Sequence, residues 1–319
     1  MDIVQVKPGR GGIRRDSGRD GFEYRSSAGR LIRAAATLRR IESLAIPPAW
    51  EHVWIASSPG AHVQATGVDA AGRTQYIYHP LWREARDVEK FSRAQAFAER
   101  LPQLRRAVTR DLGSDSSPRR AVAAAVRLID QAALRVGAED YARKNGSFGA
   151  TTLRRRHVRV EEGEVLLDFP GKSGQRWEIR LQDPLLASYL ASLPRRPATA
   201  PALCRPVRAG RRVRWQPPTP GEVNAYIAQT AGQGFTAKDF RTWQGTVTAA
   251  LALAEASQKG TDPAAAVPAA VRATAERLHN TPAVARSAYI DPRVIELFEQ
   301  GRVADRALQP DRAVLKLLD

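Results

Sequence analysis

The hydrophobic pattern of this chain changes its period near Lys90, and that change restricts the folds the chain can adopt. Before it, residues 52–80 alternate apolar and polar side chains around the hairpin signal DAAGR. From Phe91 on, apolar residues recur at helical spacing. The sequence therefore predicts an α+β protein, with a small β-rich N-terminal domain over residues 29–90 and a larger, mainly α-helical domain over residues 91–319.

Proline, glycine and capping residues mark the helix ends. Pro118 opens one helix and Gly137 is placed to close it, while Thr236 and Asp239 form a capping-box variant before a long helix. The helices expected in the whole chain cover residues 29–44, 91–111, 117–137, 222–230, 236–257, 268–278 and 292–300. The segments RHVRVEEGEVLLDF and QRWEIRL, separated by the turn PGKSG, predict a small β insert, and residues 194–220 a Pro/Arg-rich connection.

The charge of the chain points to its class of partner. Lys and Arg number 50 against 33 Asp and Glu, which gives a formal net charge of +17. Such an excess favours a polyanion, most plausibly nucleic acid, because binding releases condensed counterions. Residues 1–28, rich in Gly, Arg and Ser, are expected to form a basic arm. A basic structural protein remains open on charge alone.

The sequence gives no sign of a metal site or of a membrane segment. Cys204 is the only cysteine, and the five histidines show no ligand spacing, so we expect no metal. The first residues lack an apolar signal region, and no apolar run of membrane-spanning length follows. We therefore expect a cytoplasmic, nucleoid-associated protein that needs no cofactor.

Several charged or polar residues lie at expected helix ends or turns. They are Arg135 in ALRVGAEDY, Lys172 in FPGKSG, Lys238 and Arg241 in FTAKDFRTW, and Asn280 and Tyr289 in HNTPAVARSAYIDP. Taken singly, each is an ordinary feature, because an arginine or lysine is usually a solvated charge and a tyrosine near a helix end usually packs. Their shared order along the chain carries more weight.

In that order, these segments together with NGSFGATTLRRRHV resemble the catalytic domain of type IB DNA topoisomerases of the poxvirus-like branch, which also occurs in bacteria. IPPAW and GRTQYIYHP are similar to the N-terminal domain of that branch. The resemblance implies an enzyme that relaxes supercoiled double-stranded DNA by transient single-strand cleavage, strand rotation and religation, without ATP, metal or cofactor. It also implies a monomer that closes on DNA as a clamp, and the helical domain would be catalytic.

The resemblance assigns a role to each catalytic candidate. Tyr289 would be the nucleophile that forms a 3′-phosphotyrosyl intermediate. Its hydroxyl, with an ordinary pKa near 10, needs a cationic pocket to react at neutral pH. Arg135 and Arg241 would hold the non-bridging phosphate oxygens, and Lys172 would protonate the leaving 5′-oxygen. Asn280 stands where poxviral relatives carry histidine, so it would stabilise the transition state without carrying a proton.

The resemblance also marks DNA contacts. Lys238 would support a phosphate, and Gln75, Tyr76 and Tyr78 form the Gln-Tyr-x-Tyr strand that poxviral relatives use against DNA; a strand with one packed tyrosine face is the alternative. Tyr141 would be a further contact. Ala138 replaces a lysine that contacts a base in those relatives, which removes the basis for an inherited sequence preference.

Two other functions fit parts of the pattern. A tyrosine recombinase shares the Arg/Lys/Arg/Tyr chemistry, but it typically has His-x-x-Arg where this chain has Lys238 to Arg241, and its N-terminal domain is helical. A non-enzymatic basic DNA-binding protein would need only the charge. The complete ordered set of motifs favours the topoisomerase.

Overall fold

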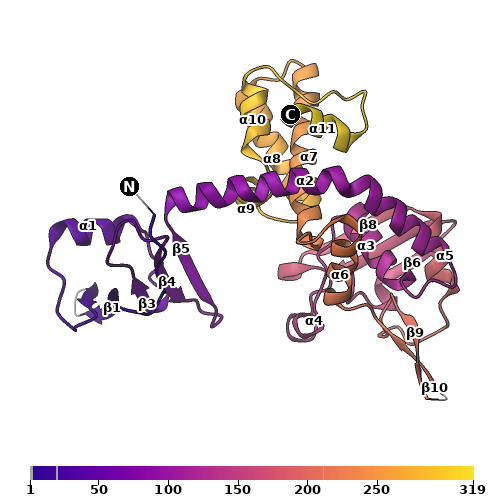
Figure 1. Ribbon diagram of the computed structural model, residues 1–319, viewed down its shortest axis with the longest axis horizontal. Helices are drawn as coiled ribbons and strands as arrows, with labels where there is room; N and C mark the ends of the chain where they lie inside the picture. Colours follow the sequence, from indigo (N-terminus) through magenta and orange to yellow (C-terminus); the bar gives the residue numbers. More distant parts are fainter. Residues whose placement is uncertain (1–2, 19–20, 211) are drawn as a thin grey trace. The chain divides into compact units, whose positions relative to one another are not determined.

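The computed structural model describes residues 3–18, 21–210 and 212–319, and it divides the chain into two compact units, Met1–Lys90 and Phe91–Asp319 (Figure 1). The fold is α+β, as the sequence predicts: an antiparallel sheet dominates the first unit and helices dominate the second. No helix of the described residues is long and apolar enough to cross a membrane.

The first unit is built on a five-stranded antiparallel sheet in the order β2-β1-β3-β4-β5. The strands are β1 (Ile13–Gly18), β2 (Gly21–Ser26), β3 (Glu51–Ile55), β4 (Val63–Val68) and β5 (Thr74–Tyr78). The helix α1 (Ala35–Ser43) contributes Ile41 to a core that also contains Ile13, Val53, Ile55 and Ala65. The alternation predicted from the sequence is seen in β5, whose side chains are alternately exposed and half-buried, whereas β4 is buried along nearly all of its length.

The basic arm expected over residues 1–28 is not an arm where the structure describes it. Residues 13–18 and 21–26 pair with each other as β1 and β2, and β1 also pairs with β3. Among the described residues of this hairpin only Ile13 is buried. The two strands therefore lack the alternation of apolar and polar residues by which a strand is predicted from sequence. Residues 1, 2, 19 and 20 of the expected arm lie outside the described residues. The following helix also starts later than expected, at Ala35.

The second unit is mainly helical. The helix α2 (Pro80–Gly113) begins before the unit boundary and continues into this unit. The helices that follow it are α3 (Arg120–Ala132), α4 (Glu139–Asn145), α5 (Pro184–Ser192), α6 (Pro220–Ala231), α7 (Ala237–Gln258), α8 (Pro263–Leu278), α9 (Pro282–Tyr289), α10 (Pro292–Glu299) and α11 (Pro310–Leu318). The helix α7 contacts α8, α9, α10 and α11, and it is buried along most of its length. This makes α7 the element around which the C-terminal helices are arranged.

Two small β elements accompany these helices. The expected β insert is a three-stranded antiparallel sheet of β6 (Val158–Glu161), β7 (Glu164–Pro170) and β8 (Arg176–Gln182). The Pro/Arg-rich connection contains a two-stranded ribbon of β9 (Arg205–Ala209) and β10 (Arg212–Gln216), which the sequence did not predict. All five side chains of β10 are exposed, so no buried face produces a readable pattern there.

Candidate active site

Arg241 lies on the first turns of α7 with its side chain buried, 3% exposed. Its guanidinium donates from Nη2 to the carbonyl oxygen of Leu278 at 2.7 Å and from Nη1 to the carbonyl oxygen of Ala133. Leu278 ends α8, and Ala133 closes α3 in the left-handed conformation. The C-terminal carbonyls of two helices therefore hold the cation, where the helix dipoles favour positive charge. Among the described residues its Nε atom has no partner.

Tyr289 is the last residue of α9 and is 9% exposed. Its backbone lies against α7 at Gly245, where an added Cβ would come within 2.6 Å of the Tyr289 carbonyl oxygen. The neighbouring Thr246 hydroxyl donates to that oxygen at 3.3 Å and accepts from the amide of Asp291 at 3.1 Å. A glycine and a threonine on α7 thus fix the tyrosine at a helix end.

Arg135 lies in the loop between α3 and α4 and reaches the same place. Its Nη1 is 3.5 Å from the Tyr289 hydroxyl, and its Nη2 donates to Asn280 Oδ1 at 3.0 Å. The loop is held by the Ala150 amide, which donates to the Arg135 carbonyl oxygen at 2.9 Å. Gly149 lets the backbones approach, since a Cβ there would lie 2.5 Å from that oxygen.

The two arginines change the acidity of the tyrosine. Burial alone raises the pKa of Tyr289, but the positive charges of Arg241 and Arg135 outweigh it, and the net shift is downward from 10.0. The Arg241 guanidinium carbon lies 5.3 Å from the centre of the Tyr289 ring. Burial, with Arg135 adding to it, lowers the pKa of Arg241 to about 10, so this guanidinium is still charged at neutral pH. The hydroxyl of Tyr289 is therefore more acidic than that of an ordinary tyrosine.

Asn280 connects α8 to α9 beside these groups. Its backbone amide donates to Ala275 O at 2.9 Å, and its Oδ1 accepts from Arg135. The amide nitrogen Nδ2 is buried and has no partner among the described residues. Because Arg135 occupies the oxygen, the donor end of the amide is left available for a ligand.

Lys172 stands apart from this group on the exposed turn between β7 and β8. Within the described part of the chain no hydrogen bond or ion pair of its side chain is found. The base of the turn is held firmly: Gly171 lies so close to Trp177 that a Cβ would come within 2.2 Å of the indole Nε1. Trp177 in turn stacks on His279 with ring centres 3.8 Å apart and an interplanar angle of 15°.

Two family models match the chain: the catalytic core of eukaryotic DNA topoisomerase I over residues 80–300, and the N-terminal domain of bacterial DNA topoisomerase IB over residues 21–69. The DNA topoisomerase 1B of Acanthamoeba polyphaga mimivirus is 30% identical over 296 residues, which are 91% of this chain and 88% of that protein. The chain belongs to the type IB DNA topoisomerase family. It is a type I DNA topoisomerase, and this excludes the two alternatives, a tyrosine recombinase and a non-enzymatic DNA-binding protein.

Shorter matches agree with this family. The DNA topoisomerase 1 of Mycosarcoma maydis is 29% identical over 178 residues, covering 51% of this chain and 17% of that protein. The DNA topoisomerase 1 of Daucus carota is 26% identical over 163 residues, covering 50% of this chain and 19% of that protein. DNA is the substrate that the family implies for this topoisomerase.

Four of the five catalytic candidates of this topoisomerase meet in the structure. Arg135, Arg241, Asn280 and Tyr289 come from different elements and form one cluster, whereas Lys172 is linked to it only through the hairpin base. Lys238, on the first turn of α7, is exposed. The cluster's carbonyl acceptors and the Trp177–His279 stack had no sequence signal, because each is a contact between distant segments.

The expected DNA contacts are mostly exposed. Tyr141 on α4 is 44% exposed. On β5, Tyr76 and Tyr78 stack on each other with ring centres 5.8 Å apart and are 46% and 38% exposed, so the tyrosine face is not packed into the core. Gln75 points to the other face of the strand and donates to Asp69 Oδ2 at 2.8 Å.

Proposed function

We propose that this topoisomerase relaxes supercoiled DNA by using the Tyr289 hydroxyl to cut and rejoin one strand of the duplex. The observation that carries the proposal is the position of Tyr289 between Arg241 and Arg135, which lowers the pKa of its hydroxyl although the side chain is buried. A buried tyrosine with no such role would instead become less acidic.

In the cleavage step the Tyr289 oxygen attacks phosphorus as its own proton passes to solvent water. A new phosphorus–oxygen bond to the tyrosine forms, and the bond to the 5′-oxygen breaks. The products are a 3′-phosphotyrosyl ester and a 5′-hydroxyl end. The cut strand then rotates about the intact one, and attack by the 5′-hydroxyl reverses the step. The ester retains the phosphodiester bond energy, so religation needs no ATP.

Arg135, Arg241 and Asn280 would bind the two non-bridging oxygens, whose charge increases during attack. Nε of Arg241 and Nδ2 of Asn280 support this role, because both are buried donors that have no acceptor among the described residues. Asn280 can donate a hydrogen bond but cannot transfer a proton, so it would act by stabilising charge. The arginines would be fixed before DNA arrives, because Arg241 is held by helix carbonyls and Arg135 by Asn280.

Lys172 would protonate the leaving 5′-oxygen as the hairpin closes on DNA. Its exposure, and the absence of a protein partner among the described residues, support a group that waits for its substrate. Lys238 would contact a neighbouring phosphate from the start of α7, and Tyr141 would contact DNA from α4.

We further propose that the enzyme works as a monomer whose two units close on duplex DNA as a clamp, in association with the nucleoid. The β-rich unit would bind DNA through Tyr76 and Tyr78, whose exposed rings can reach bases or the backbone. Gln75 would have to release Asp69 before joining them. Residues 91–319 would form the catalytic domain.

The proposal is tested by relaxation of a supercoiled plasmid with EDTA present and without ATP. The wild-type enzyme is expected to relax the plasmid, and Tyr289→Phe is expected to bind it but leave it supercoiled, since only one oxygen is removed. Protein–DNA complexes trapped with denaturant and digested with a protease should carry DNA on the peptide that contains Tyr289. Appreciable relaxation by Tyr289→Phe, or DNA attached to another residue, would refute the assignment.

A further inference from the structure

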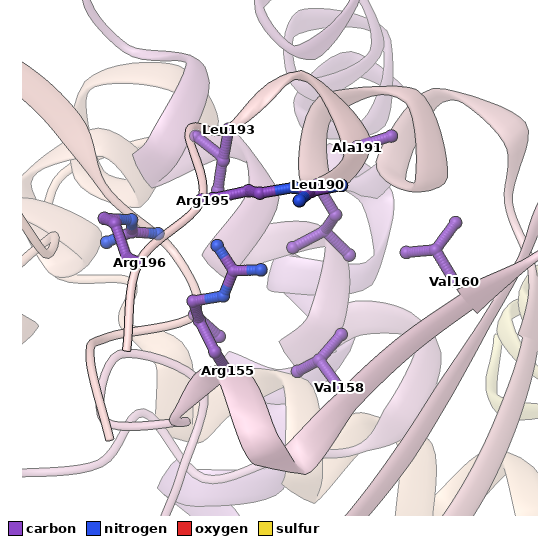
Figure 2. Close-up of a pocket in the computed structure, with 9 residues that line it drawn as sticks. Arg155, Val158, Val160, Leu190, Ala191, Leu193, Arg195 and Arg196 are labelled. Carbon is purple, nitrogen blue, oxygen red and sulfur yellow. The ribbon is translucent and has the colours of Figure 1, made fainter. Parts of the chain in front are cut away.

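A cavity with a volume of about 410 Å³ lies in the mainly helical unit, and its lining includes none of the proposed catalytic residues (Figure 2). Val158 and Val160 of β6 form one side, and Leu190 of α5 with Leu193 forms another. Figure 2 shows the side chains of Arg155, Val158 and Leu190 turned toward the same space. The volume falls in the range of small-molecule sites.

Three arginines surround this cavity, namely Arg155, Arg195 and Arg196, and none of the described residues that line it carries a carboxylate. Arg155 Nη1 donates to the Pro194 carbonyl oxygen at 2.7 Å, but none of the three arginines forms an ion pair with any described residue. Arg196 has its Nε and Nη2 atoms buried without a partner in that same part of the chain. Buried charged donors are costly unless an acceptor reaches them, so the guanidinium groups around this cavity favour an anionic ligand.

The frame of the cavity is already formed. The amides of Arg155 and Arg156 donate to the carbonyl oxygens of Ala200 and Ala198 at 2.9 and 3.0 Å. The amide of Ala202 donates to the Leu153 carbonyl oxygen at 2.7 Å. These bonds tie the loop that carries Arg195 and Arg196 to the segment that carries Arg155. The three cations are therefore held together by the backbone despite their mutual repulsion.

We infer that this cavity binds the phosphate group of a nucleotide, with the arginines around the phosphate and the apolar side chains against the sugar or base. Guanidinium groups match phosphate oxygens with paired donors, whereas a purely inorganic anion would leave the wall of valine and leucine without a contact. The nucleotide could be free or part of a DNA strand, since the phosphate chemistry is the same. Nothing in this site requires Tyr289, so it stands or falls apart from the proposed function.

The test is isothermal titration calorimetry on the full chain at about 0.15 M salt, where weak surface attraction is screened. The ligands are dAMP, inorganic phosphate and deoxyadenosine. The variants are Arg196→Gln and the control Arg312→Gln, which removes the same charge from an exposed residue of α11. Thermal unfolding of both variants checks that they fold.

We expect one saturable site for dAMP, weaker binding of phosphate and none of deoxyadenosine. Arg196→Gln should weaken dAMP binding about ten-fold or more, the scale of losing hydrogen bonds to a charged group, and Arg312→Gln less than two-fold. If a short duplex displaces dAMP, the source is DNA; if both bind together, it is free nucleotide. Absence of saturable dAMP binding, or equal weakening in both variants, overturns the inference. If Arg196→Gln does not fold, Arg195→Gln, an exposed side chain at the rim, replaces it under the same criteria.

Discussion

Tyr289, which would attack the phosphorus of the scissile bond, and Lys172, which would protonate its leaving 5′-oxygen, lie in opposite surroundings. Tyr289 is buried beside two arginines, packs with Ala133 at the end of α3 and with Leu278 of α8, and its backbone lies against Gly245 and Thr246 of α7. Lys172 is exposed on a short turn whose base alone is anchored. Groups that stabilise developing charge gain from being fixed in advance, whereas an acid must follow its leaving group. This difference is the one expected if a rigid cationic wall, formed by Arg135 and Arg241, works with Lys172 as a proton donor on an exposed turn.

The largest expected effect on the cleavage rate comes from Lys172, the proposed proton donor, and it tests the contrast between Lys172 and Tyr289 most directly. Lys172→Ala should slow cleavage by about 10²- to 10⁴-fold, the range of general acid catalysis. Replacing the bridging 5′-oxygen with sulfur should restore much of this rate, because a thiolate leaves without a proton. Single-turnover cleavage of both substrates measures it. Lack of rescue would move the acid to another residue, with Lys238 as the next candidate.

The rigid wall is tested at Arg241. Arg241→Ala should slow cleavage by about 10²- to 10³-fold, the effect of removing a preorganised charge-stabilising donor. Arg241→Lys should recover little, because a compact ammonium group lacks the planar fork that reaches the carbonyls of Ala133 and Leu278 and leaves Nε for a phosphate. The 5′-sulfur substrate should not rescue either variant in the same single-turnover assay. If sulfur rescued an Arg241 variant as well as it rescues Lys172→Ala, the proposed difference between the roles of Arg241 and Lys172 would be wrong.

The link between the two regions is the stack of Trp177 on His279, next to Asn280. Trp177→Ala should loosen the hairpin base and slow cleavage about ten-fold, within the range by which a misplaced catalytic group loses rate. If Trp177 positions Lys172, the 5′-sulfur substrate should rescue this variant as well. Trp215→Ala, at an exposed residue of β10, serves as the control and should keep its rate. A Trp177→Ala defect that sulfur leaves unchanged would mean that the stack supports only the wall.

The smallest expected effect concerns the packing behind Tyr289. Gly245→Ala should lower the free energy of unfolding by about 1–3 kcal/mol, because its Cβ would press on the tyrosine backbone. Gly221→Ala on α6 is the matched control, since there the nearest atom would be the Thr219 hydroxyl oxygen at 3.9 Å. Denaturant unfolding of both variants measures the change. If Gly245→Ala and Gly221→Ala were equally stable, the backbone around Tyr289 would be able to shift despite its burial.

Local sequence patterns determined much of this protein. The change of period near Lys90 gave the α+β class, and the capping box at Thr236 marked the start of α7. The order of the motifs predicted the family, which the family model and the mimivirus relative confirm. It also identified Arg135, Arg241 and Tyr289 as candidate catalytic residues. These features depend on neighbouring residues or on the side chains themselves, so they can be read along the chain.

Only the tertiary structure decided which groups touch. It assigned Ala133 and Leu278 as the carbonyls that hold Arg241, stacked Trp177 on His279, and brought Arg196 into a cavity without a carboxylate. It also turned residues 13–18 and 21–26 into strands, and the one buried isoleucine among these described residues gives no periodic signal. Such contacts join segments far apart in the sequence, and their energy comes from burial and hydrogen bonds that exist only once the helices and sheets have packed together.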